Sequence, residues 1–170
     1  GELLFFTVQG TVKRTEWAEY SVARPVFPAI KLKTGDELLN VEQYDPDIQS
    51  TMCFVSKEGI CLNADKDDIP VQGRVTAGVR GMLLNDGDEV IFATQFYGEG
   101  EIIILSDQGY IKRVVSSLFN PMGRGRKGMM IVDNKSKVIF ADYVTLPYKV
   151  AILRSDNSVE EIDTENISIE

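Results

Sequence analysis

Three arginines stand 50 residues apart in the sequence, and a Lys-Arg pair occurs twice, about two such intervals apart. The arginines are Arg24, Arg74 and Arg124, and the pairs are Lys13-Arg14 and Lys112-Arg113. A side chain that recurs at one place in each structural repeat is expected to point outward in the same direction every time. Such a series of cations would line one curved edge and suit the phosphates of a nucleic-acid backbone.

The stretch Arg124-Gly125-Arg126-Lys127-Gly128 carries the densest positive charge, with three cations in a glycine-rich loop whose backbone amides could also bind phosphate. Two other interpretations remain open. The repeated arginines could pair with acids of a neighbouring repeat, such as Asp36 or Asp88, and the Lys-Arg pairs could simply be solvated surface charge.

The overall charge opposes a polyanionic partner, because 18 Lys and Arg face 26 Asp and Glu, a net of −8. The distribution is uneven, however. Residues 101–128 hold five basic and two acidic residues, a local +3, whereas residues 40–72 and 151–170 each have a local charge of −5. A bipolar surface is therefore expected, with binding confined to part of it.

The elements that position these cations recur as β-hairpins. Each has an apolar run, a polar turn and an alternating run, and the turns of the first three contain Gly10, Gly59 and Gly109. Glycine supplies the positive φ of a tight turn. Ser158 stands at this place in the fourth copy, so a different turn is expected there. Leu62-Asn63 and Glu161-Ile162 replace the Lys-Arg pair in the second and fourth copies.

A second recurring turn lies between the hairpins, with Gly35 in Leu32–Leu38 and Gly87 in Leu84–Val90. Asp36 and Asp88 follow these glycines and are expected to accept backbone hydrogen bonds. About four short strands per repeat of about 50 residues predict an all-β, propeller-like fold. The approximate units are 3–48, 49–99, 100–147 and 148–170, which give three full blades and part of a fourth, and favour a fragment of a longer array.

Composition excludes several kinds of site. The chain has no His and two Cys, so a zinc site is excluded, and no metal, cofactor or catalytic constellation is expected. Cys53 and Cys61 are interpreted as buried apolar residues that do not face each other directly. Trp17, Phe27, Phe92 and Phe96 are expected in the core. No apolar run could span a membrane, and a cytoplasmic location is predicted.

The order Gly10-Thr11-Val12-Lys13-Arg14-Thr15, then Leu32–Asp36, then Gly73–Gly81 and Asp86-Gly87-Asp88 resembles the carboxy-terminal domain of the A subunit of bacterial type IIA topoisomerases, DNA gyrase and topoisomerase IV. The resemblance covers nearly the whole chain. It implies a β-pinwheel, a propeller-like disc whose blades swap strands and whose basic perimeter binds and bends double-stranded DNA without sequence preference.

The resemblance also implies a non-catalytic role in a nucleoid-associated enzyme, next to the ATPase B subunit and the rest of the A subunit. The residues predicted to bind DNA are Lys13, Arg14, Arg24, Arg74, Arg80, Lys112, Arg113, Arg124, Arg126 and Lys127. Gyrase carries a glutamine-, arginine- and glycine-rich box in the linker of its first blade, whereas Tyr20–Pro28 lacks one here, which favours topoisomerase IV. The alternative is a protein-interaction propeller without a direct DNA role, which the net charge favours.

Overall fold

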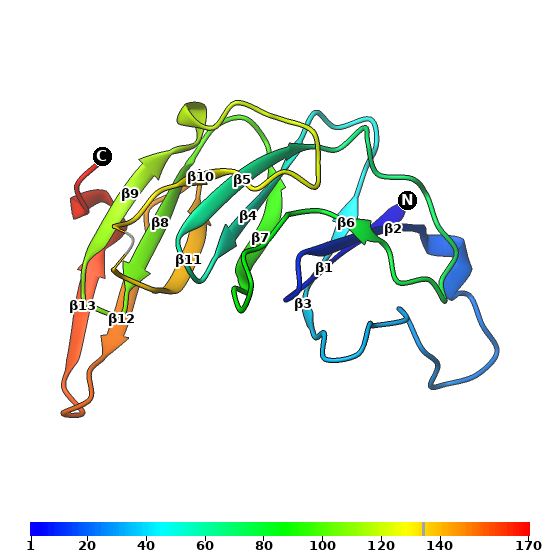
Figure 1. The fold of residues 1–170 in the computed structure, drawn as a ribbon, viewed down its shortest axis with the longest axis horizontal. Coiled ribbons are helices and arrows are strands. Elements are labelled where there is room, and N and C mark those ends of the chain that lie inside the picture. The colour runs from blue at the N-terminus through cyan, green and yellow to red at the C-terminus, as the bar shows by residue number, and fades with distance from the viewer. Residues whose placement is uncertain (134) are drawn as a thin grey trace.

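The computed structural model describes residues 1–133 and 135–170, and it consists mainly of antiparallel strands. Four sheets follow one another along the chain and stand side by side in an arc (Figure 1). The predicted all-β, propeller-like fold is confirmed, with three blades and part of a fourth, and the sheets do not close into a ring. The helical elements assigned in the described residues are the short 3-10 turns η1 (Trp17–Tyr20), η2 (Ser116–Leu118) and η3 (Thr164–Asn166), and none of them could span a membrane.

The first two blades are four-stranded, and the last strand of each comes from the following repeat. Their strand orders are β3-β1-β2-β6 and β7-β4-β5-β10. The strands are β1 (Glu2–Thr7), β2 (Thr11–Glu16), β3 (Leu38–Tyr44), β4 (Thr51–Ser56), β5 (Ile60–Asp65), β6 (Val79–Arg80), β7 (Val90–Phe96) and β10 (Met129–Met130). Because β6 pairs with β2 and β10 pairs with β5, neighbouring blades exchange strands, as the resemblance to a pinwheel implies.

The third and fourth sheets have three and two strands in the described residues. The third has the order β11-β8-β9, and the fourth pairs β12 with β13. These strands are β8 (Glu101–Ser106), β9 (Ile111–Val115), β11 (Val138–Val144), β12 (Lys149–Leu153) and β13 (Val159–Asp163).

Glycine has the expected conformation in the recurring turns. The φ angles of Gly10, Gly59, Gly109, Gly35 and Gly87 lie between +76° and +82°. In the fourth hairpin Asn157 takes this conformation instead, with a φ of +65°. The prediction of a different fourth turn at Ser158 is therefore wrong, because Asn tolerates the left-handed region and the same turn forms one residue earlier.

The corrected turn changes which residues match the Lys-Arg pairs. Leu153 pairs with Val159 in the fourth hairpin, as Leu105 pairs with Ile111 in the third. Glu160-Glu161 therefore occupies the place of Lys112-Arg113, and the fourth blade carries two acids there.

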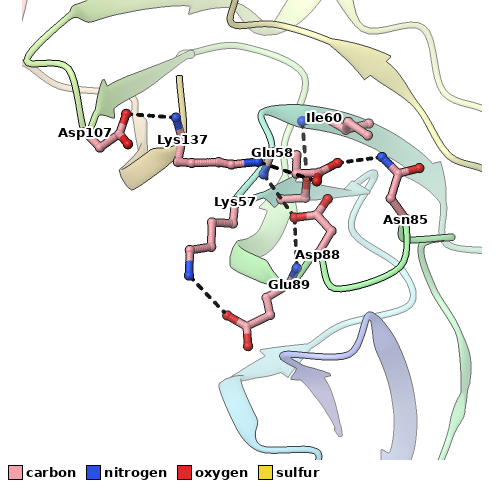
Figure 2. Close-up of polar contacts among 9 residues, drawn as sticks. Lys57, Glu58, Ile60, Asn85, Asp88, Glu89, Asp107 and Lys137 are labelled. Atoms are coloured by element: carbon pink, nitrogen blue, oxygen red, sulfur yellow. Dashed lines mark hydrogen bonds and ion pairs between the residues drawn. The ribbon is translucent and has the colours of Figure 1, made fainter. Parts of the chain in front are cut away.

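The two aspartates of the second turn accept backbone hydrogen bonds, as predicted. Asp36 Oδ1 accepts from the Gln9 and Glu37 amides, at 2.9 Å each. Asp88 Oδ1 accepts in the same way from Glu58, at 3.0 Å, and from Glu89, at 2.9 Å (Figure 2). Each aspartate thus ties the hairpin turn of its own blade to the strand that follows.

Neighbouring blades are joined near these turns and along their inner strands. The Val90 amide donates to the Val8 carbonyl of the first blade, at 2.8 Å. Lys137 of the third blade reaches Glu58 of the second, with Nζ 3.5 Å from Oε1 (Figure 2). On the inner strands β3 and β7, the Glu42 carboxylate accepts from Thr94 and from both the backbone and side chain of Gln95.

The apolar core is shared between blades. One cluster combines Leu4, Phe6 and Val12 of the first blade with Phe54, Leu62 and Met82 of the second, and another joins the second blade to the third. A blade on its own would therefore leave apolar surface exposed.

The cysteines and aromatic residues match the sequence predictions in part. Cys53 and Cys61 are buried and free, and they are not opposite each other in the β4–β5 register, although their sulfurs lie 3.8 Å apart. Phe96 is buried, and Phe27 and Phe92 are half-buried. Trp17 is 59% exposed, so its assignment to the core was wrong. It lies on η1, which has no buried residue.

Candidate nucleic-acid interface

Two long segments cross from one blade to the preceding blade along the convex side of the arc (Figure 1). Residues 67–82, the second crossover segment, run from β5 to the edge of β2, where β6 pairs with Thr11 and Val12. Residues 116–131, the third crossover segment, run from β9 to the edge of β5. In the first blade, residues 21–34 form the corresponding first loop after η1. Most of the predicted cations lie on these three stretches.

Glycine allows each crossover segment to approach the strand that it covers. Gly78 and Gly128 both have a φ of +90°. A Cβ atom at Gly78 would lie 2.5 Å from the Val12 carbonyl oxygen, and one at Gly128 would lie 2.3 Å from the Cys61 carbonyl oxygen. Real Cβ atoms do not come so near a backbone atom, so both the φ angle and the contact require glycine.

Arg74 and Arg124 hold the crossover segments to the preceding blade through backbone carbonyls. Arg74 Nη1 donates to Pro28 O at 2.5 Å, and its guanidinium lies 5.3 Å from the centre of the Phe27 ring. Arg124 donates from Nε to Asp68 O at 2.8 Å and from Nη1 to Arg80 O at 3.1 Å. A carbonyl carries no net charge, so both guanidinium groups keep a positive charge that can attract phosphate.

The alternative pairing of these arginines with Asp36 or Asp88 is not found among the described residues. In both residues Oδ1 accepts backbone amides of the turns, and both side chains are buried. The crossover contacts thus give Arg74 and Arg124 a structural role beside any role in binding, whereas Arg24 lies exposed on the first loop.

Several cations on these stretches are exposed. The structure places Arg24, Arg80, Arg126 and Lys127, all predicted from the sequence, at the surface. It also exposes Lys31 and Lys33, which the sequence reasoning missed because they do not recur in the other repeats. A signal for them was available, since residues 21–34 contain three basic residues and no acid.

The three stretches touch one another in sequence order along the arc. The Lys31 amide of the first loop donates to Thr76 O of the second crossover segment at 3.1 Å. The Leu83 amide, just after that segment, donates to Arg126 O of the third at 2.9 Å. We call the cations that they carry the cationic track; its members are Arg24, Lys31, Lys33, Arg74, Arg80, Arg124, Arg126 and Lys127.

Lys13 does not belong to the surface, and the prediction that it points outward is wrong. Its side chain is fully buried, and Nζ donates to the carbonyls of Ala29, at 3.0 Å, and Arg74. The second crossover segment covers this face of β2, so the side chain points into the contact between blades. Burial, and to a lesser extent the charge of Arg74, lowers the pKa of Lys13 from its ordinary value of 10.5 to about 8, while Glu19 opposes the shift.

The arginines of the two pairs are engaged with carboxylates. Arg14 forms an ion pair with Glu2, and Arg113 Nη1 lies 3.1 Å from Glu101 Oε2. The hydrogen bond to Glu2 raises the pKa of the Arg14 guanidinium. These partners stand at equivalent places in the first and third blades, so they form the same ion pair twice.

Lys112 also has an acidic partner, with Nζ 3.3 Å from Glu170 Oε2. The predicted edge of repeated Lys-Arg pairs is therefore not an uncompensated positive surface. The available positive charge lies on the crossover segments and the first loop.

The second and third crossover segments differ in their acidic residues. The second crossover segment begins with Asp67 and Asp68, and Glu19 Oε2 accepts from the Arg74 amide at 3.2 Å. The third crossover segment contains Arg124, Arg126 and Lys127 and no acid. It is therefore the stretch best suited to a polyanion.

Comparison with known proteins agrees with this architecture. A family model described as the DNA gyrase C-terminal domain, beta-propeller, matches residues 1–44, 51–95 and 100–144. The chain is 28% identical over 167 residues to the DNA gyrase A protein of Klebsiella oxytoca, covering 96% of this chain and 19% of that protein. It is 31% identical over 137 residues to the DNA topoisomerase 4 A protein of Bacillus subtilis (strain 168), covering 79% and 17%. The chain thus spans less than a fifth of the length of these relatives.

Solved structures share the fold. The crystal structure of the C-terminal domain of DNA topoisomerase IV superposes with a TM-score of 0.89 at 23% identity, over 100% of this chain and 54% of that one. The DNA gyrase A C-terminal domain superposes with a TM-score of 0.79 at 22% identity, over 99% and 57%. The family model matches the three blades in turn, and the chain therefore belongs to the family of DNA gyrase C-terminal domains, which are β-propellers.

Proposed function

We propose that this chain is a non-catalytic DNA-binding and DNA-bending domain of the A subunit of a bacterial type IIA topoisomerase. The observation that supports the proposal is the cationic track, whose exposed charges lie on the first loop and on two crossover segments that run along the convex side of the arc (Figure 1). Family membership supports the choice of DNA as the polyanion.

The interface suits phosphates better than base edges. Its charged groups are arginine and lysine side chains on loops, and such groups bind the DNA backbone without reading sequence. A duplex that follows contacts from the first loop to the third crossover segment must curve with the arc. The domain would thereby guide a bent duplex segment toward a catalytic core elsewhere in the protein.

The parent protein we propose is an ATP-dependent isomerase that acts in the bacterial cytoplasm on nucleoid DNA. The protein partners that follow are an ATPase B subunit and the remainder of the A subunit. We favour topoisomerase IV over gyrase, because residues 20–28 lack a glutamine-, arginine- and glycine-rich box. Deleting the domain from the full-length enzyme separates the two, since loss of decatenation supports topoisomerase IV and loss of negative supercoiling supports gyrase.

Fluorescence anisotropy with a labelled 40-base-pair duplex tests the binding proposal. If about five phosphates are neutralised, log K should fall against log salt with a slope of about −4 to −5. Arg126→Gln/Lys127→Gln should weaken binding to every sequence alike and make the slope shallower by about 1.8. Lys149→Gln removes one exposed cation of β12, outside the track, and should leave binding unchanged.

Absence of duplex binding at low salt would overturn the proposal and favour the protein-interaction propeller. Binding that depends on Lys149 as much as on Arg126 and Lys127 would place the interface elsewhere.

A further inference from the structure

Lys13 connects two stretches of the cationic track from inside the protein. Its Nζ donates both to Ala29 O, on the first loop, and to Arg74 O, on the second crossover segment. The ammonium group also lies 5.1 Å from the centre of the Phe5 ring beneath it. One buried side chain therefore holds the backbones of two cation-bearing segments.

A buried lysine is not required by the fold at this place. The equivalent residue of the second blade is Leu62, which is fully buried in the core shared with the first blade. In the third blade it is Lys112, whose side chain is 26% exposed and pairs with Glu170. Only the first blade has the 21–34 loop beside this position. Among the equivalent residues Lys13, Leu62 and Lys112, only Lys13 binds two loop carbonyls in the described part of the chain.

Other contacts between the two stretches lie close to Lys13. Arg74 Nη1 donates to Pro28 O, next to Ala29, and the Lys31 amide donates to Thr76 O. Residues 21–34 contain no regular strand or helix, so the loop is held by these contacts, by the Lys13 bonds and by Tyr20 Oη, which donates to Ala29 O at 3.0 Å. The exposed cations of this loop are Arg24, Lys31 and Lys33.

We propose that Lys13 is a positioning residue that holds the cationic first loop against the second crossover segment, so that both stretches can contact one DNA duplex. This inference rests on the proposed DNA-binding function. Lys13 touches no solvent and therefore acts through the loop rather than on a phosphate.

The charges around Lys13 should make DNA binding depend on pH. The groups that face it are Arg74 of the second crossover segment, Glu19 and Tyr20 of η1, and the Phe5 ring of β1. A phosphate bound near Arg74 would offset the repulsion between Arg74 and Lys13 and raise the pKa of Lys13, which is about 8 without DNA.

DNA binding should then take up protons near pH 8. If DNA raises the pKa of Lys13 by one unit, binding takes up about 0.4 proton per chain at pH 8. The affinity for DNA should then be about tenfold lower at pH well above 9 than at low pH. Titration calorimetry in two buffers of different ionisation enthalpy measures the proton uptake.

The decisive variant is Lys13→Met, which keeps an unbranched side chain and removes the charge. Its control is Lys66→Met, since Lys66 is also buried and donates to two loop carbonyls, those of Pro46 at 3.0 Å and Ile48 at 2.6 Å. That loop carries no track cation. Both variants are compared with the wild-type chain in duplex affinity, salt slope and hydrogen exchange of the Lys31 amide.

We expect Lys13→Met to increase exchange at Lys31, to make the salt slope shallower by up to about 2.7 through loss of three loop cations, and to abolish proton uptake. Lys66→Met should change none of these. If Lys13→Met does not fold, Lys13→Leu, which copies the second blade, replaces it.

Two kinds of failure are distinguishable. If the wild-type chain does not bind a duplex, the proposed function fails, while the Lys31 exchange still reports whether Lys13 holds the loop. If the wild-type chain binds and Lys13→Met binds with the same slope and proton uptake, the positioning role is overturned. Equal effects of Lys13→Met and Lys66→Met would show that both lysines only stabilise the fold, and would overturn the positioning role.

Discussion

The stability of this domain should depend on pH through Lys13. The folded chain buries the ammonium group, and its pKa falls from 10.5 to about 8. Between these values the unfolded chain binds more protons than the folded chain, so the free energy of unfolding must rise as pH rises. Below pH 8 the group is charged in both states, and the stabilisation is lost.

The expected size follows from the two pKa values. Integrating proton binding from pH 7 to 9.5, with 8 for the folded chain and 10.5 for the unfolded chain, gives a gain of about 2 kcal/mol. The Lys13 side chain has no solvent exposure, so little of this gain should be screened. Staying below pH 10 avoids ionisation of tyrosines such as Tyr20, whose pKa is raised by burial.

Urea unfolding of the wild-type chain and of Lys13→Met at pH 7, 8, 9 and 9.5 measures this effect. Other titrating groups are common to both proteins, so their contributions cancel in the difference. The wild-type chain should gain about 2 kcal/mol relative to the variant across the range. A difference that does not change with pH would refute the burial of a charged Lys13.

Three further outcomes are expected. Gly128→Ala should destabilise the fold by about 3 kcal/mol or more in urea unfolding, because its Cβ would meet a β5 carbonyl. The control Gly87→Ala, at a φ of +79° with open space around it, should destabilise the fold by only about 1 kcal/mol. Equal losses of stability would contradict the close approach at Gly128. Glu42→Ala should cost about 2 kcal/mol in the same assay, because Gln95 loses its partner between blades; no loss would show that the contact is not made. Asp68→Asn should raise duplex affinity about twofold at low salt and not at high salt, measured by anisotropy; a decrease would contradict repulsion of DNA by this acid.

The strands and turns were predictable because their determinants are local. Alternating apolar residues and a glycine every 49 or 50 residues specify the hairpins, and each turn adopts the expected positive φ. The prediction for the fourth turn was wrong because Asn157 also tolerates the positive φ. Matching glycine positions therefore placed the fourth hairpin one residue too late.

The site was predictable only in part, because its determinants are distant in the sequence. Lys13 and Arg14 are adjacent, yet Lys13 is buried against Arg74, 61 residues away, and Arg14 is paired with Glu2. Strand periodicity does not show which face the exchanged segment of the next repeat will cover. The exposed cations of residues 21–34 do not recur, so reasoning from repeats passed over Lys31 and Lys33.

We propose that DNA lies along the cationic track. Hydrogen exchange of the chain with and without a saturating 40-base-pair duplex tests it most directly. We expect DNA to slow exchange in residues 22–33, 74–83 and 123–128 and to leave the inner strands β3, β7 and β11 unchanged. Slower exchange confined to those inner strands would contradict it.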